Sequence, residues 1–434
     1  MNSIEMNTMT SNSNSNSVKN VCIVGVGYVG ENLVGSFSAY SKYNVIGFDL
    51  NKERLKVMES KYTSCKFTNN ENDLTDVDLF CIAVPTLLNE SKDNIEQGPI
   101  NSVKKMLMRI AKRGSTVVIE SSVYVGATRK LFSSLLDHGI FVGFSPERVD
   151  PGRTVPAHSE IPKIVSGLDK ASLDIITEYY SNVIDKVVPV SSTECAEMCK
   201  LYENCFRLIN ISYTNEISDL CKKYNVDSFE MVNAAKTKPF GFMPFYPGLG
   251  IGGYCIPVNP YYLANGDFSN LSCLYTSLKN TEMRPIEKAK EILKENKDAK
   301  RILVVGAAFK PGEVLLVNSP SVDLVNTLVN DSVDVVVYDP LVVRDCKNYN
   351  NVFPQPPQNS YLHNLFNKLT MSEKSKGTVT WMQKEEFSIK NLIDNFDIVI
   401  VALKQHEIDW SVLDKYERFD KKVYWFIDRN EVVN

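Results

Sequence analysis

The sequence VCIVGVGYVG, residues 21–30, decides the fold of this chain. A short apolar run at 21–24 predicts a buried strand, a G-x-G-x-x-G turn follows at once, and a helical pattern begins at Glu31. A second apolar run, residues 44–48, ends at Asp49. That order of strand, glycine turn, helix, strand and acid predicts a dinucleotide-binding unit whose carboxylate takes the ribose hydroxyls.

The preferred dinucleotide follows from the charge at Asp49, which would repel the additional phosphate of NADP. We therefore expect NAD. Lys52 and Arg54 lie nearby, and they suit either the adenosine side of the cofactor or an exposed helix start.

The alternation of strands and helices continues through this first region. Apolar runs at 78–84, 116–120 and 139–144 predict three more buried strands. Thr86, Ser122 and Glu147 follow their ends, and ligands of open parallel sheets bind beyond the carboxyl ends of strands. Each residue alone could also be a turn or cap residue.

A long helix is predicted from about residue 193 to about Tyr224. Lys200 and Asn204 are four residues apart and therefore share one face. The lysine could be a surface residue with a buried aliphatic stem, or a cation directed at a ligand.

The sequence PGLGIGGYCIP, residues 247–257, is a glycine-rich loop that ends in a thiol. Glycine lets the backbone approach a ligand closely, and the thiolate form of Cys255 would be a strong nucleophile. The aromatic and proline-rich run 237–246 precedes the loop and is too broken for a helix or a central strand. A flexible loop that carries a small buried cysteine is the alternative.

A second α/β region starts near residue 300, with predicted strands at 301–306, 333–338, 397–402 and 423–428 and a helix at 319–330. Residues 343–387 are polar and rich in Pro and Asn, which predicts a long insertion. We thus expect an α/β fold of two doubly wound, Rossmann-like domains joined by a long central helix. The expected boundaries are a disordered tail at 1–17, an NAD-binding domain at 18–192, a central helical domain at 193–298 and a C-terminal domain at 299–434.

Composition excludes several classes of function. The net charge of −4 over 434 residues gives no general attraction for nucleic acid or anionic membranes, and no apolar run approaches the roughly 20 residues of a membrane span. Ten cysteines without a secretory signal predict reduced thiols in the cytoplasm. Cys195 and Cys199 have helical spacing, but no histidine accompanies them, so no metal site is expected.

The chain resembles the UDP-glucose/GDP-mannose dehydrogenases from about residue 19 to its end. The finer resemblance, to the UDP-N-acetylglucosamine 6-dehydrogenases, rests on SPERVDPG at 145–152 and on the run 237–263. It implies NAD-dependent oxidation of C6 of a UDP-sugar to the UDP-uronic acid, with UDP-N-acetylglucosamine favoured and UDP-glucose next. It also implies a homodimer or larger homo-oligomer paired through the central helix, and a role in glycan or polysaccharide synthesis.

The resemblance carries roles onto individual residues. Cys255 matches the nucleophile, Lys200 and Asn204 match groups that stabilise oxyanions and hold a water, Ser122 matches a residue that orients the water, and Glu147 matches the general base of thioester hydrolysis. The expected NAD contacts are Gly25, Gly27, Tyr28, Val29, Gly30, Asp49, Arg54, Val84, Pro85, Thr86 and Ser122. The expected substrate contacts are Glu147, Arg148, Lys200, Asn204, Phe245, Tyr246, Gly248, Gly250, Gly252 and Lys310 from the C-terminal domain.

Two positions depart from the family pattern. Asn259 stands where the family has an aspartate four residues after the cysteine, and an amide cannot act as a base. Val317 stands where the family has an arginine that approaches the NAD phosphates. Because a charge-assisted hydrogen bond contributes about 1.5–3 kcal/mol, we expect weaker NAD binding by about one to two powers of ten. The alternative hypothesis is an impaired homologue that only binds UDP-sugar or NAD, or that stops at the aldehyde.

Overall fold

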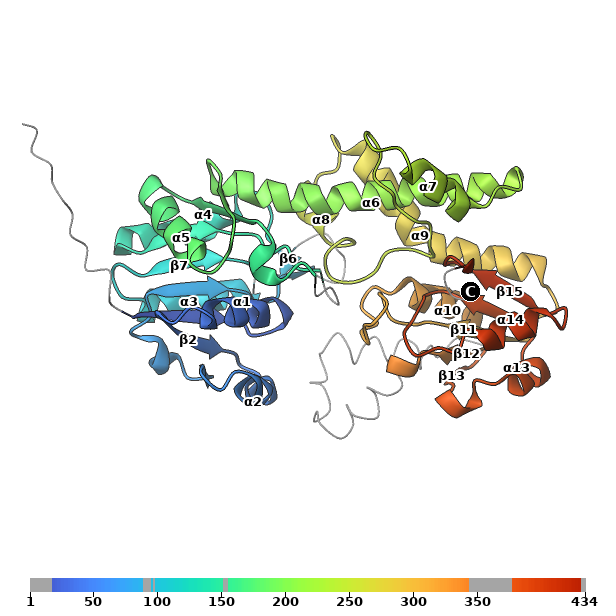
Figure 1. The fold of residues 1–434 in the computed structure, drawn as a ribbon. Coiled ribbons are helices and arrows are strands. Elements are labelled where there is room, and N and C mark those ends of the chain that lie inside the picture. The colour runs from blue at the N-terminus through green and yellow to red at the C-terminus, as the bar shows by residue number, and fades with distance from the viewer. Residues whose placement is uncertain (1–17, 89–94, 97, 151–154, 343–376, 431–434) are drawn as a thin grey trace, which may run out of the picture. The chain divides into compact units, whose positions relative to one another are not determined.

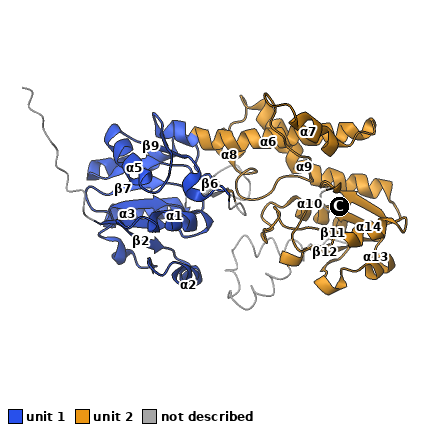
Figure 2. Ribbon diagram, viewed as in Figure 1, with its two compact units in different colours: residues 1–87, 95–149, 153–197 blue, residues 88–94, 150–152, 198–434 orange. Residues whose placement is uncertain are grey.

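The computed structural model describes residues 18–88, 95–96, 98–150, 155–342 and 377–430. It divides into two compact units (Figure 2). Unit 1 holds residues 1–87, 95–149 and 153–197, and unit 2 holds residues 88–94, 150–152 and 198–434. The predicted tail at 1–17 lies outside the described residues. No helix in the described ranges is both long and apolar enough to cross a membrane.

Unit 1 is built on a sheet of eight strands in the order β10-β9-β8-β7-β4-β1-β2-β3. Neighbouring strands are parallel except β8 and β9, which pair antiparallel. The strands are β1 Lys19–Val24, β2 Tyr43–Phe48, β3 Lys66–Thr68, β4 Leu79–Ile82, β7 Thr116–Ile119, β8 Phe141–Phe144, β9 Lys163–Gly167 and β10 Val187–Pro189. From β1 the chain proceeds to β2 and β3 on one side of the sheet and then returns to β4 on the other side. The switch point therefore lies between β1 and β4, and doubly wound sheets bind ligands at such a point.

Helices connect these strands, and Figure 1 labels most of them. They are α1 Tyr28–Ser38, α2 Lys52–Lys61, α3 Gly98–Ile110, α4 Ala127–Phe132 and α5 Lys170–Ser181, with 3₁₀ turns η1 Glu71–Leu74, η2 Ser133–His138 and η3 His158–Glu160. Leu33, Val34 and Phe37 of α1 pack into the core that contains Val21 and Ile23 of β1. This helical spacing of apolar residues explains why α1 covers the sheet. Strands β5 Leu87–Leu88 and β6 Ile95–Glu96 form a separate two-stranded sheet.

The long helix predicted from residue 193 is α6, Thr193–Lys223. Three further helices of the central region are α7 Ser228–Lys236, α8 Asn259–Ala264 and α9 Ser272–Glu295. The run 237–257 between α7 and α8 contains neither helix nor strand, as its prolines and glycines predicted.

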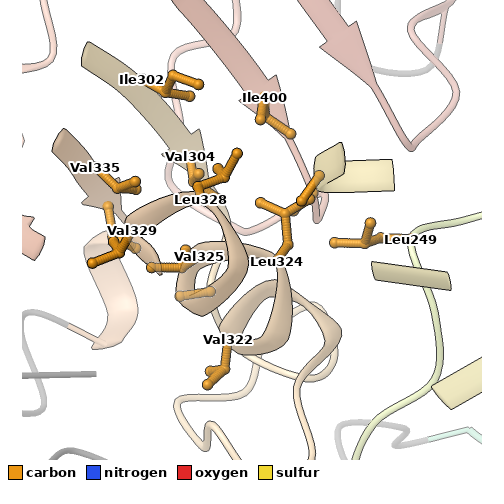
Figure 3. Close-up of a cluster of buried hydrophobic side chains, with 14 of the residues drawn as sticks. Leu249, Ile302, Val304, Val322, Leu324, Val325, Leu328, Val329, Val335 and Ile400 are labelled. Carbon is orange, nitrogen blue, oxygen red and sulfur yellow. The ribbon is translucent and has the colours of Figure 1, made fainter. Parts of the chain in front are cut away.

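A second parallel sheet in unit 2 has the strand order β13-β12-β11-β14-β15. Its strands are β11 Arg301–Val305, β12 Asp334–Tyr338, β13 Val379–Trp381, β14 Ile398–Val401 and β15 Lys422–Trp425, and its helices are α10 Pro320–Asn330, α13 Ile389–Asn395, α14 Ser411–Glu417 and the 3₁₀ turn η4 Lys384–Glu386. Figure 3 shows apolar side chains of α10 against those of β11, β12 and β14. The predicted fold class, two doubly wound α/β domains with a long central helix, is confirmed.

The structure differs from the sequence prediction in the smaller elements. Strands β3, β9, β10 and β13 were not predicted, because each is short or carries a charged residue. The predicted insertion 343–387 is also too long, because residues 379–381 pair with β12 as a strand. Residues 343–376 lie outside the described part of the chain.

Candidate functional site

The three glycines of the first turn occupy three different environments in unit 1. Gly25 has φ +88°, and a Cβ there would lie 2.6 Å from the carbonyl oxygen of Ala83; a Cβ on Gly30 would lie 1.9 Å from the carbonyl oxygen of Gly25. A Cβ on Gly27, by contrast, would meet nothing within 4 Å. Gly25 thus makes the tight turn, Gly30 permits close helix packing, and Gly27 leaves the open space that a pyrophosphate needs.

The acidic residue after β2 is held by this turn. Asp49 Oδ2 accepts from the Val26 amide at 3.0 Å, and Oδ1 accepts from the Asn51 amide at 2.9 Å. Arg54 donates from Nε to the Val26 carbonyl at 2.7 Å and forms an ion pair with Glu31. The predicted carboxylate therefore lies beside the glycine turn, where it suits a ribose, while Arg54 also braces the turn itself.

The ends of β4 and β7 bring predicted cofactor residues together. The Thr86 hydroxyl donates to the Ser122 carbonyl at 2.7 Å, and the Ser121 hydroxyl donates to the Val84 carbonyl at 2.6 Å. These two hydrogen bonds hold the segment that follows β4 beside the segment that follows β7. Tyr28, at the start of α1, is exposed. With the open Gly27 turn, these residues of unit 1 fit a bound NAD.

Glu147 is buried, and its carboxylate accepts three hydrogen bonds and lies beside a histidine ring. Oε1 accepts from the amides of Arg148 at 2.6 Å and Val149 at 2.8 Å. Oε2 accepts from Lys163 Nζ at 2.9 Å and lies 3.2 Å from His158 Nε2. A carboxylate has about four lone-pair sites, so three sites of Glu147 are occupied within unit 1, and the role of His158 towards the fourth depends on the tautomer of its ring.

Lys163 joins Glu147 to a second buried carboxylate. Its Nζ lies 2.6 Å from Glu120 Oε2, and Glu120 also accepts a hydrogen bond from the Tyr180 hydroxyl. The side-chain exposures of Lys163 and Glu120 are 3% and 0%. The lysine is therefore the cation of a buried charged cluster, and the sequence analysis did not include it.

The charges of this cluster shift its pKa values in opposite directions. Burial alone would raise the pKa of Glu147, but the charge of Lys163 and the contact with His158 outweigh burial and bring the pKa well below its ordinary range. Burial raises the pKa of Glu120, and Lys163 opposes that rise only in part. Glu147 is therefore ionised at neutral pH and has a low affinity for protons.

The glycine loop of unit 2 packs closely against other parts of the same unit. A Cβ on Gly250 would lie 2.9 Å from Pro320 Cβ, and one on Gly252 would lie 2.6 Å from Phe309 Cβ. Leu249 is buried in the core shown in Figure 3. Close packing against the C-terminal sheet region therefore explains part of the glycine content of this loop, in addition to any contact with a ligand.

The start of the loop is held from two helices. The Gly248 amide donates to Asn215 Oδ1 at 2.9 Å, and the Gly248 carbonyl accepts from Arg284 Nε at 2.9 Å. Arg284 is 8% exposed and forms a 2.6 Å ion pair with Asp219. A Cβ on Gly248 would meet only the Phe426 carbonyl, at 3.7 Å, so this position leaves room for a ligand.

The candidate nucleophile lies four residues before the start of α8. Cys255 is exposed, and its carbonyl accepts from the Asn259 amide at 2.9 Å. Asn259 is 1% exposed, and its Oδ1 accepts a hydrogen bond from Asn204 Nδ2. The structure thereby joins three predicted residues, and Lys200, one turn before Asn204 on α6, is half-buried.

The other predicted substrate residues have varied surroundings. Lys310 Nζ lies 2.6 Å from Asp150 Oδ1, and Arg148 donates to the Pro162 carbonyl at 2.9 Å. The ring of Phe245 packs against Phe206. The Tyr246 hydroxyl donates to Asn233 Oδ1 at 2.8 Å. These contacts fix the residues, and their roles in binding stay predictions.

Val317, at the second departure from the family pattern, is fully buried. Its carbonyl accepts from the Gly253 amide at 2.8 Å, and Leu316 belongs to the core of Figure 3. Leu316 and Val317 therefore pack beneath the glycine loop.

Several residues that shape these sites were not found by sequence reasoning: Glu120, His158, Lys163, Asn215, Asp219 and Arg284. Lys163 had a visible signal, because it begins an apolar run that is β9. Glu120 ends the apolar run that contains β7, and the others lie on helices or a 3₁₀ turn where a polar residue is ordinary. In the described ranges, no group of three or more His, Cys, Asp or Glu residues could hold a metal ion.

A doubly wound sheet with an open glycine turn and an acid at the adjacent strand end is typical of the dinucleotide-binding class of proteins. Comparison with protein families is more specific. Residues 19–184 match the NAD binding domain of the UDP-glucose/GDP-mannose dehydrogenase family, residues 194–273 its central domain, and residues 303–434 its UDP binding domain. The chain belongs to this family and is an NAD-dependent oxidoreductase.

Among curated relatives, Protein CapL of Staphylococcus aureus is 31% identical over 74% of this chain and 82% of its own length. UDP-N-acetyl-D-glucosamine 6-dehydrogenase of Pseudomonas aeruginosa is 32% identical over 74% of this chain and 83% of its own length. A solved UDP-N-acetylmannosamine dehydrogenase of Pyrococcus horikoshii has a TM-score of 0.73 at 24% identity, over 92% of this chain and 93% of that chain. That structure supports the fold.

Proposed function

We propose that this protein oxidises C6 of a UDP-sugar twice, with NAD, to give the UDP-uronic acid through a thiohemiacetal and a thioester on Cys255. UDP-N-acetylglucosamine is the favoured substrate and UDP-glucose is the next. The observation that carries the proposal is the exposed thiol of Cys255 joined through Asn259 to Asn204, in a chain whose other unit has an open glycine turn.

The residues have distinct tasks in this reaction. NAD supplies the hydride acceptor for both oxidations. The Cys255 thiolate attacks the aldehyde carbon, and the tetrahedral oxygen that results is stabilised by the Lys200 ammonium and the Asn204 amide. Water then displaces the thiolate from the thioester, Ser122 orients that water, and Glu147 carries its proton away. Removal of one such oxyanion donor typically slows an enzyme about 100- to 1,000-fold.

Substrate recognition is assigned to unit 2. Gly248 leaves space above a loop that Asn215 and Arg284 hold in place, and Lys310 supplies a cation for a phosphate. The preference for an N-acetylated sugar rests on the sequences 145–152 and 237–263 and on the relative from P. aeruginosa, which is named for that sugar.

The test is a panel assay that measures NADH per sugar with UDP-N-acetylglucosamine, UDP-glucose and UDP-N-acetylmannosamine. We expect two NADH per UDP-N-acetylglucosamine and an acid product. Cys255→Ser should abolish acid formation, whereas the matched variant Cys273→Ser, at another exposed thiol, should leave it unchanged. Acid formation at the normal rate by Cys255→Ser would exclude the thioester route.

Asn259 and Val317 favour a second possibility, in which the protein stops at the aldehyde or only binds its ligands. One NADH per sugar would indicate the aldehyde stop. Absence of NADH with every sugar, together with UDP-sugar binding in calorimetry, would favour the binding role.

We further propose that the protein is a homodimer or larger homo-oligomer in the cytoplasm. One face of α6 supports this proposal, because it exposes Met198, Tyr202, Tyr213 and Leu220. Exposed apolar residues on one helix suit pairing with a second copy. Sedimentation at several concentrations measures the assembly, and a purely monomeric protein would contradict it.

A further inference from the structure

The proposed reaction must release protons from a buried carboxylate. Per sugar, one water and two oxidised cofactors yield a carboxylate and three protons. Glu147, which takes the proton of the attacking water, has a side-chain exposure of only 6%. A base in this position acts again only after its proton has left.

Four groups lie within hydrogen-bonding distance of the Glu147 carboxylate, and one of them can act as either donor or acceptor. Two donors are backbone amides, and the third is Lys163, which is held by Glu120 as well. The fourth is His158, whose neutral ring has one donor and one acceptor nitrogen. Its Nε2 lies 3.2 Å from Glu147 Oε2.

The other ring nitrogen of His158 leads towards solvent. Its Nδ1 lies 2.5 Å from Ser36 Oγ on α1. Ser36 in turn lines a surface pocket of about 250 Å³, with Tyr40, Asn182 and Asp185 among its walls. Glu147, His158 and Ser36 therefore form a continuous hydrogen-bonded chain from the buried carboxylate to this pocket, entirely within unit 1.

We propose that His158 and Ser36 carry the proton of Glu147 to solvent. This inference rests on the proposed function, because it needs Glu147 to accept a proton during thioester hydrolysis. In this proposal His158 and Ser36 act through Glu147 as positioning and proton-transfer residues.

The transfer conserves atoms and charge. The Oε2–H bond of protonated Glu147 breaks and an Nε2–H bond forms on His158, which becomes an imidazolium. Nδ1 then loses its proton to Ser36 Oγ as the serine gives its own proton to water in the pocket. The Nε2 proton then leaves for water when the ring turns about its Cβ–Cγ bond towards the pocket, and the ring takes up a proton from water at Nδ1, which restores the starting tautomer without a net gain or loss of protons. The positive charge of Lys163 lowers the pKa of Glu147, which favours release of the proton from the carboxyl group.

The kinetic test uses the full protein with NAD and its UDP-sugar. We expect His158→Gln to lower kcat about 100-fold, the low end of proton-transfer effects, with the KM of the sugar and the melting temperature unchanged. His158→Ala should regain activity with added imidazole, and Ser36→Ala should show a smaller fall in kcat. The matched control is His138→Gln, in the same unit, whose Nδ1 faces a backbone carbonyl.

Two kinetic outcomes would overturn the relay. One is an unchanged kcat in His158→Gln. The other is a loss of activity that imidazole does not restore and that accompanies a lower melting temperature, which would indicate a structural role.

A second measurement does not depend on activity. The chain has four histidines, so ¹⁵N spectra of histidine-labelled protein are simple, and His158→Gln assigns its signals. We expect Glu147→Gln to move the Nε2 resonance of His158 and Ser36→Ala to move its Nδ1 resonance, while His138 stays unchanged. If neither resonance moves, the chain of contacts is absent and the proposal fails. If wild type makes no NADH with any sugar, the proposed function fails, and the spectra alone decide whether the path exists.

Discussion

Replacement of Lys163 by methionine tests the buried charged cluster most directly. The lysine Nζ lies 2.6 Å from Glu120 and 2.9 Å from Glu147, and all three side chains are almost fully buried. Removal of one partner from a buried ion pair costs about 3–5 kcal/mol. For a unit of this size, a change of 1 kcal/mol shifts the melting temperature by about 2–4 °C, so Lys163→Met should lower it by about 6–20 °C.

The fall in melting temperature caused by Lys163→Met should depend on pH in a defined direction. Burial lowers the pKa of Lys163, but the two carboxylates outweigh burial and raise it, so its stabilisation is complete below the unfolded pKa of about 10.4. Glu147 has a lowered pKa, so its stabilisation is present above the unfolded value of about 4.3 and disappears as pH falls through the folded value. In Lys163→Met the carboxylates lose their cation and their pKa values rise. The variant then gains stability as pH falls. The difference in melting temperature between wild type and Lys163→Met should therefore be smaller at pH 5 than at pH 8.

Thermal unfolding followed by fluorescence at pH 5, 6.5 and 8 measures this effect. Lys170→Met is the matched control, because Lys170 pairs with Asp174 on the surface of the same unit, with 81% of its side chain exposed. Exposed pairs of this kind contribute about 0.3–0.5 kcal/mol. Equal shifts for the two variants, or a Lys163→Met difference that does not change with pH, would refute the reasoning.

Three further predictions concern the loop and the turn. Asn259→Asp keeps the acceptor for Asn204 and supplies a carboxylate that can hold Lys200 charged or help to deprotonate water, so steady-state NADH formation should rise about tenfold; no gain would mean that other groups compensate. Gly252→Ala should destabilise the protein by about 1–3 kcal/mol through overpacking, whereas Gly248→Ala should keep the melting temperature and raise the KM of the UDP-sugar; equal stability losses would contradict the packing argument. Gly27→Ala should weaken NAD binding in calorimetry by tenfold or more, about 1.4 kcal/mol, without a change in melting temperature, and unaltered affinity would place the pyrophosphate elsewhere.

The sequence by itself determined the fold class. The apolar runs of β1, β2, β4, β11, β12 and β14 are continuous because these strands lie in parallel sheets with both faces covered, and that continuity is visible without coordinates. The glycine turn could also be recognised from the sequence, since its three glycine positions need three different backbone properties. The candidate nucleophile Cys255 and its proposed partners Lys200 and Asn204 on α6 were predicted from residue type, spacing and family resemblance.

Only the tertiary structure decided how charges are paired and which glycines are required by packing. Lys163 is far from Glu120 in the chain, and their contact depends on the pairing of β7, β8 and β9, which local periodicity does not encode. The short strands β3 and β10 were missed for the same reason, because sheet neighbours stabilise them more than their own sequence does. Sequence patterns report what each segment prefers, whereas the pKa of Glu147 depends on groups that folding brings within hydrogen-bonding distance from separate segments.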